Sequence, residues 1–209
     1  MDIKRQEALR KFIDLIADPK LQKLCASLPL KFDFMTAPAA CRRHQAYEGG
    51  LVDHTLEVLE IALATASALP LKGLINRDVL IVAALWHDFG KIWDYEPNEA
   101  KHPPTGMVPD LKAPDFVYTR HRWTIRHLVR SYHCFCTRAE EVGLDKDLTE
   151  EIAHAILGHH GRAEWGSPVE PLTPEAMILH QADMLSAAFT DGYKHIFREP
   201  RQDWSKVSI

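Results

Sequence analysis

The sequence predicts an all-α protein, built as one domain of about six helices. Apolar residues recur with helical spacing along most of the chain, and no segment alternates like a half-buried strand. The 209 residues, 46% of them hydrophobic, suffice for one continuous core. Five prolines fall within residues 94–120, where we expect a loop excursion from the helical body.

Three helices are predicted in the first half of the chain. The first covers residues 5–17 and the second residues 50–68, each with apolar side chains gathered on one face. The third begins at Asp78, interpreted as its N-cap, and continues to Gly90, a natural stop. Because this third segment is long, nearly all apolar and contains two alanines, we interpret it as a buried helix rather than a buried strand.

Three more helices are predicted after the proline-rich excursion. Residues 121–142 form one, which ends near Gly143, and another begins at Thr149. A glycine-containing loop over residues 158–171 follows. Pro174 occupies a favoured first helical position and begins a last long helix.

We expect these helices to form a single domain over residues 1–209, with a core of about residues 16–190. Residues 1–40 are then a helical N-terminal extension packed on the core, and residues 199–209 a loose tail. No internal repeat or low-complexity segment suggests a second unit.

Composition excludes several classes of protein. The 25 basic and 29 acidic side chains leave a net charge of −4, which argues against a protein that coats nucleic acid through bulk charge. No apolar run reaches the roughly 18 residues that a membrane span requires, and the charged N-terminus lacks an apolar signal core. The four cysteines have no framework spacing, so we expect reduced thiols and a cytoplasmic location.

The pair His87-Asp88 stands at the end of an apolar helix. Burying an ionised carboxylate costs several kcal/mol unless a partner offsets the cost. A metal ion would do so, since imidazole and carboxylate together suit Mn, Fe, Co or Zn. A hydrogen-bonded His–Asp pair that caps the helix remains the alternative.

Two other helices each place a similar group on an apolar side. His54 lies on the apolar face of residues 50–68, and Asp183 is embedded in the apolar segment ILHQADMLSAA. Taken alone, His54 is typical of a satisfied core histidine, and Asp183 of a cap or an ion-pair partner. Three helices that all place such groups on apolar sides together favour a metal site.

A second cluster is predicted around His159-His160. Adjacent residues of a helix point about 100° apart, so both can face one site only near a helix end, which Gly158 and Gly161 supply. His127 can add a third imidazole, with His121 and His133 as competitors on the same segment. An ion held there would share the Asp88 carboxylate with the first, and two ions about 3.5–4 Å apart can clamp a phosphate ester.

The order of these residues resembles the HD metal-dependent phosphohydrolase superfamily. More narrowly, the segments GGLVDHT, LWHDFGKI and HHGRAEWGSPVEPLTPEAMILHQAD are similar to its 3′–5′ exoribonuclease (YhaM-type) branch. The similarity covers about residues 16–190. It implies an HD-domain helical bundle, from which the segment near residues 94–120 departs.

The resemblance also implies two ligand sets. The first is His54, His87, Asp88 and Asp183, and the second is Asp88, His127, His159 and His160. They would hold one or two divalent transition metal ions, with Mn favoured and Fe, Co, Ni or Zn as alternatives.

Lys91 matches the lysine of the family's HDxGK variant, which makes Asp88 and Lys91 the candidate catalytic residues. The ammonium could contact a phosphate oxygen or protonate the leaving group. The alternative is an ordinary positive charge at a helix C-terminus. Glu164, Trp165 and Ser167 match the branch's signature without an assigned chemical step.

A basic segment lies next to His127. Arg122, Arg126 and Arg130 are spaced as one ridge of a continuous helix, and Trp123, Tyr132 and Phe135 interleave with them. Such a ridge could guide a phosphate backbone while the aromatic rings stack on bases. The alternative is a solvated face paired with the acids of residues 140–147.

The sequence thus predicts metal-dependent hydrolysis of a phosphate ester, with a 3′–5′ exonuclease on single-stranded nucleic acid as the leading form. A nucleotidase or cyclic-nucleotide phosphodiesterase is the first alternative. The second is a non-catalytic HD module that binds metal or nucleotide, because the related exonucleases carry an OB-type domain before the HD domain, whereas the residues before Gly49 are predicted helical here.

Overall fold

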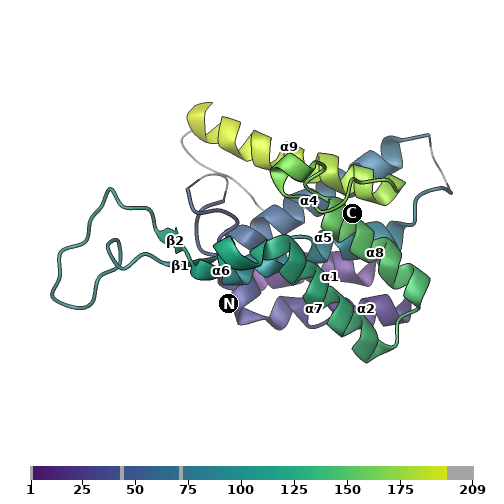
Figure 1. Ribbon diagram of the computed structural model, residues 1–209, viewed down its shortest axis with the longest axis horizontal. Helices are drawn as coiled ribbons and strands as arrows, with labels where there is room; N and C mark the ends of the chain where they lie inside the picture. The colour runs from purple at the N-terminus through teal and green to yellow at the C-terminus, as the bar shows by residue number, and fades with distance from the viewer. Residues whose placement is uncertain (1, 43–44, 71–72, 197–209) are drawn as a thin grey trace.

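Helices make up most of the structure, a computed structural model that describes residues 2–42, 45–70 and 73–196, with the backbone alone from residue 190 (Figure 1). The predicted all-α class is confirmed. The α-helices are α1 (Ile3–Asp14), α2 (Pro19–Cys25), α3 (Phe32–Thr36), α4 (Gly50–Ala68), α5 (Arg77–Trp86), α6 (Arg120–Thr124), α7 (Arg126–Val142), α8 (Lys146–Gly158) and α9 (Pro174–Ile196). Short 3-10 turns are η1 (Leu28–Leu30), η2 (Phe89–Trp93) and η3 (Ala163–Trp165).

The proline-rich excursion is a hairpin that extends away from the helices (Figure 1). The prediction of no strand was wrong at its base, where β1 (Tyr95–Pro97) and β2 (Phe116–Tyr118) pair antiparallel with Tyr95 opposite Tyr118. The two strands are three residues each, too short for alternation to register in the sequence. Thr119 fixes the base further, since its hydroxyl donates to the Trp93 carbonyl at 2.6 Å.

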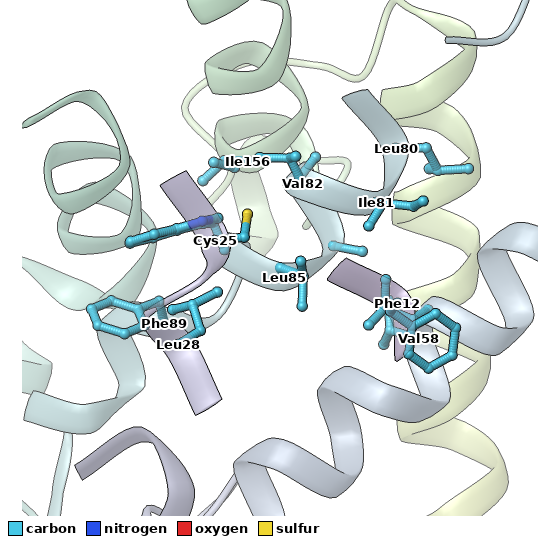
Figure 2. Close-up of a cluster of buried hydrophobic side chains, with 14 of the residues drawn as sticks. Phe12, Cys25, Leu28, Val58, Leu80, Ile81, Val82, Leu85, Phe89 and Ile156 are labelled. Carbon is cyan, nitrogen blue, oxygen red and sulfur yellow. The ribbon is translucent and has the colours of Figure 1, made fainter. Parts of the chain in front are cut away.

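Helix α5 forms the centre of the core, as its apolar sequence predicts. Every residue from Val79 to Trp86 is buried, and α5 packs against α2, α4, α7, α8 and α9. Figure 2 shows how side chains from α1, α2, α4, α5 and α8 meet around it. A helix apolar on all sides must be enclosed in this way, so the segment after α5 emerges inside the protein rather than at its surface.

Several predicted helix boundaries were wrong. The first helix, predicted over residues 5–17, is α1 at Ile3–Asp14 with Asp2 as its cap. Asn76, not Asp78, caps α5, while the Asp78 carboxylate accepts from the backbone of residues 17–18. Asp145, not Thr149, caps α8. Helix α5 ends at Trp86 rather than Gly90, so the pair His87-Asp88 occupies the junction between α5 and η2.

The N-terminal helices pack on the rest of the bundle. Helix α1 contacts α4, where Arg5 donates to both carboxylate oxygens of Asp53 at 2.7 Å, and α2 contacts α5 and α7. The predicted loose tail at residues 199–209 lies outside the described residues. Within the described part of the chain, no helix is long and apolar enough to cross a membrane.

Candidate metal centre

The fold brings together the seven residues predicted to bind metal. They come from α4, the α5–η2 junction, the start of α7, the end of α8, and α9. All are buried except His160 and Asp183, which are partly exposed. The seven are His54, His87, Asp88, His127, His159, His160 and Asp183.

The first cluster combines two imidazoles and two carboxylates. The Nε2 atom of His54 lies 3.0 Å from Oδ1 of Asp183 and 3.4 Å from Oδ2 of Asp88. Nε2 of His87 lies 3.4 Å from the same Oδ2 atom. One donor atom from each of the four residues falls within 4.8 Å of all the others, which is compact enough for one ion.

The second cluster lies on the other side of Asp88. Nε2 of His127 is 3.2 Å from Nε2 of His160 and 3.4 Å from Oδ1 of Asp88. Nε2 of His159 is 3.7 Å from the same oxygen. The three imidazole donors lie within 4.8 Å of one another. Asp88 therefore presents one carboxylate oxygen to each cluster.

The donor set fits bound cations. Oδ1 of Asp88 and Nε2 of His159 are fully buried, yet neither makes a hydrogen bond among the described residues. Leaving such atoms unpaired costs about 1–3 kcal/mol or more in a protein interior. A divalent ion in the second cluster would satisfy both atoms, and imidazole and carboxylate are ligands that Mn, Fe, Co, Ni and Zn accept.

Three of the histidines have their proton fixed on the outward nitrogen. Nδ1 of His87 and of His159 lies 2.7 Å from a backbone carbonyl, and Nδ1 of His160 lies 2.9 Å from another. A carbonyl can only accept, so Nδ1 carries the hydrogen and Nε2 keeps its lone pair toward the cluster. The carbonyls belong to Ala84, Ile156 and Trp165.

Comparison with known proteins identifies the family. A model of the HD domain matches residues 51–188. The chain belongs to the HD domain family. This confirms the resemblance carried by the ordered histidines and aspartates.

The chain also matches curated proteins, each named 3′–5′ exoribonuclease YhaM. Those from Listeria innocua and Bacillus subtilis are both 31% identical, over 87% of this chain and 53% and 52% of their own lengths. The one from Bacillus velezensis is 32% identical, over 87% and 52%. The chain thus spans about half the length of these relatives. No solved structure matches it significantly.

Two residues of the HD domain that anchor His54 were missed by the sequence analysis. Nδ1 of His54 donates to the Ser186 hydroxyl at 3.0 Å, and that hydroxyl donates to Oε2 of Glu57 at 2.7 Å. Ser186 lies one turn after Asp183 on α9 and Glu57 one turn after His54 on α4. Helical spacing from the predicted ligands was the signal that could have found them.

Asp94 anchors His127 and was also missed. It is fully buried directly after η2, and its Oδ2 atom lies 3.3 Å from Nδ1 of His127. Nη1 of Arg122 lies 3.5 Å from that oxygen and 3.3 Å from the imidazole Nδ1. Burial raises the pKa of Asp94 to about 6 against the lowering effect of Arg122. The carboxylate orients the imidazole as an outer partner of a metal ligand does.

Burial keeps most of the imidazoles neutral. Removal from water lowers the pKa of His87 and of His127, and lowers that of His160 to about 4. Burial also acts to lower the pKa of His54, but its hydrogen bonds with Asp183 and Asp88 outweigh this and raise the value to about 9. Neutral imidazole is the form that binds metal. At His54, the two neighbouring carboxylates favour the protonated imidazole, and a bound cation would take the place of that proton.

Lys91 lies inside the site rather than at a solvated helix end. Its side chain is only 10% exposed, and Nζ lies 2.5 Å from Oδ2 of Asp88. Burial acts to lower the pKa of Lys91, but the charge of Asp88 outweighs it and the net shift is upward. The side chain therefore holds a positive charge against the shared carboxylate.

The predicted arginine ridge is not continuous. Arg126 has a left-handed backbone (φ 63°), which divides the expected helix over residues 121–142 into α6 and α7. The break turns His127 into the site. Arg122 lies 3.5 Å from Asp94, and Arg130 donates to Nδ1 of His121 at 3.0 Å. Neither competitor of His127 joins the cluster, because His121 is bonded to Arg130 and His133 is exposed on α7.

The loop after α8 shapes the His159-His160 corner. Gly161 has a φ of 81°, and a Cβ atom there would lie 2.3 Å from the His180 ring, so this turn requires glycine. The Trp165 carbonyl orients His160, and the Ser167 hydroxyl lies 2.8 Å from the carbonyl oxygens of both Leu157 and Val169, to which its single hydrogen can be donated. Of the signature residues, Trp165 therefore positions His160 and Ser167 positions the loop backbone, whereas Glu164 is exposed.

Proposed function

We propose that this chain is a metal-dependent phosphohydrolase that degrades single-stranded nucleic acid from its 3′ end. The single observation that carries the proposal is Asp88, a buried carboxylate with one oxygen toward each of two imidazole clusters. Such an arrangement suits a pair of ions about 3.5–4 Å apart, as in many enzymes that cleave phosphate esters. The choice of nucleic acid is supported by relatives named exoribonuclease.

The proposed ligands divide as the two clusters do. His54, His87, Asp88 and Asp183 would hold one ion, and Asp88 with the second cluster's three imidazoles the other. When bound, such ions lower the pKa of a water molecule toward neutrality and offset negative charge on a phosphate. Manganese is our first candidate, with Fe, Co, Ni and Zn as alternatives for the same donors.

Asp88 and Lys91 are the proposed catalytic residues. The Asp88 carboxylate would fix the spacing of the two ions through its two oxygens. The Lys91 ammonium lies beside it, so we assign it the role of donating a hydrogen bond from Nζ to a phosphate oxygen. Protonation of the leaving group by the same ammonium is the alternative role.

Three further assignments belong to the proposal. Residues 1–209 would form one HD domain, which is supported by the packing of α1 on α4 and of α2 on α5 and α7. A cytoplasmic location is supported by the free thiols of all four cysteines. Arg122, Arg126 and Arg130 would contact the substrate's phosphates separately, rather than as one ridge.

Substitution of Asp88→Ala tests the proposal. Wild-type protein loaded with Mn²⁺ should shorten a 5′-labelled single-stranded oligonucleotide stepwise, and the variant should lose both the bound metal and the activity. Metal content is measured by elemental analysis and products by gel. Asp115→Ala is the matched control, because this aspartate is exposed in the hairpin and should retain both properties.

Full metal content and activity in Asp88→Ala would contradict the assignment. A wild-type preference for mononucleotides or cyclic nucleotides, with the oligonucleotide left intact, would replace the exonuclease by a nucleotidase or phosphodiesterase. Bound metal without hydrolysis of nucleotides, nitrophenyl phosphates or RNA would instead indicate a non-catalytic module.

A further inference from the structure

Three aromatic rings form a strip at the base of the hairpin. Tyr95 and Tyr118 are partners across the two strands, with ring centroids 5.7 Å apart. Trp123 on α6 meets Tyr118 edge-on, with centroids 5.5 Å apart. In Figure 1, α6 lies next to the base of the β1–β2 hairpin. We call these residues, Tyr95, Tyr118 and Trp123, the aromatic strip.

The outer two rings of the strip are available to a ligand. Trp123 is 69% exposed and Tyr118 is 45% exposed. Tyr95 packs against Tyr118, is partly buried, and its hydroxyl donates to the Ala39 carbonyl at 3.4 Å. The edge-on contact holds the Trp123 ring against a fixed neighbour, which lowers the entropy cost of stacking a ligand on it.

One side chain connects the strip to the second cluster. The Arg122 guanidinium lies 5.9 Å from the centre of the Tyr118 ring, and its Nη1 atom lies 3.3 Å from Nδ1 of His127. Arg122 thus lies next to both the second cluster and the strip. A nucleotide adjacent to a scissile phosphate at that cluster would therefore lie near the strip.

The segment that carries Tyr118 and Trp123 is rich in arginine, although the exposed Glu96 lies opposite Val117 on β1. Residues 117–138 contain five arginines and no acidic residue, although the whole chain has a net charge of −4. Arg120 and Arg126 are exposed on either side of Trp123 along the sequence. Exposed aromatic rings among arginines match a single strand, which offers unpaired base faces together with phosphates.

We propose that Tyr118 and Trp123 form a base-stacking subsite for the nucleotides next to the scissile phosphate. This inference rests on the proposed function and adds a cause of selectivity for single strands. In a duplex the base faces are already stacked on each other, so the strip would gain nothing from them. Of the other two aromatics within residues 117–138, Phe135 is fully buried and Tyr132 lies further along α7.

The test measures binding without catalysis. Fluorescence anisotropy reports the Kd of a labelled ten-nucleotide single strand in EDTA, and an abasic strand of equal length serves as the second probe. Trp123→Ala should weaken binding of the normal strand by at least about fivefold, the low end for one stacked base. Trp123→Phe should retain most of the affinity, and Tyr132→Ala, an exposed aromatic outside the strip, should match wild type.

Binding of the abasic strand should be unchanged in Trp123→Ala, and so should the salt dependence, because no phosphate contact is removed. Circular dichroism shows whether each variant is folded. A folded Trp123→Ala protein that binds the normal strand like wild type overturns the subsite, as does equal weakening toward the abasic strand. Absence of hydrolysis in metal-loaded wild type would defeat the proposed function alone, since binding is measured separately.

Discussion

Removal of the Asp94 side chain should weaken metal binding at the second cluster without affecting the first. Among the described residues, its carboxylate contacts His127 and Arg122 and forms no hydrogen bond or ion pair with the first cluster. Outer partners of this kind contribute about 10–100-fold to metal affinity. We expect Asp94→Ala to weaken binding at the second cluster by that factor and to leave the first unchanged. Isothermal titration with Mn²⁺ would then resolve two classes of site.

The matched control for Asp94 is Asp115→Ala. Asp115 lies in the hairpin that follows Asp94, and its partner is the exposed His102. Asp94→Asn keeps an oxygen that can accept from Nδ1 of His127 and should fall between wild type and Asp94→Ala. Equal weakening at both clusters in Asp94→Ala would contradict the assignment of Asp94 to the second cluster alone.

The residues predicted from sequence differ physically from those that were missed. A histidine or aspartate on an otherwise apolar helix is costly unless it has a partner, so His54, His87 and Asp183 stand out. Asp94 follows an aromatic residue in a proline-rich stretch, and its partner His127 is 33 residues away. Its role depends on tertiary packing, which local pattern does not contain.

At the scale of elements, the close contact between η2 and α7 sets the distance from Asp88 to His127. Gly90 makes this contact, because a Cβ atom there would lie 2.3 Å from the His127 carbonyl oxygen. Its amide also donates to the Ser131 hydroxyl at 2.8 Å. Gly90→Ala should therefore destabilise the protein by about 1–3 kcal/mol through overpacking and weaken binding at the second cluster. Urea unfolding and metal titration measure the two effects.

Gly143→Ala is the comparison for Gly90→Ala. Gly143 ends α7 with a left-handed backbone, but a Cβ atom there would meet nothing within 4 Å. The free energy of unfolding of this variant should fall by about 1–2 kcal/mol, because alanine is disfavoured in a left-handed conformation. Its metal affinity should stay unchanged. If Gly90→Ala binds metal at the second cluster as tightly as Gly143→Ala does, the proposed spacing role is wrong.

Elements were predictable where one local signal dominates. The helix over residues 50–68 has the predicted bounds, because a glycine precedes a long amphipathic run. The break at Arg126 was not predicted, since arginine seldom adopts a left-handed conformation and nothing nearby marks it. Helices α2 and α3 are seven and five residues long, too short for a clear period.

At the scale of the whole molecule, a buried α5 delivers the pair His87-Asp88 into the interior, where four other segments meet it. The donors come from positions as far apart as His54 and Asp183, yet their nearest atoms are 3.0 Å apart. The bundle holds two groups of imidazoles on either side of one carboxylate. This arrangement is the central claim, because the proposed chemistry, the role of Asp94 and the spacing set by Gly90 all depend on it.

Anomalous diffraction from crystals grown with Mn²⁺ tests this claim most directly. We expect two peaks about 3.5–4 Å apart, one among His54, His87 and Asp183 and one among the second cluster's imidazoles, with Asp88 between them. A single peak, or peaks that do not contact Asp88, would contradict the two-ion centre.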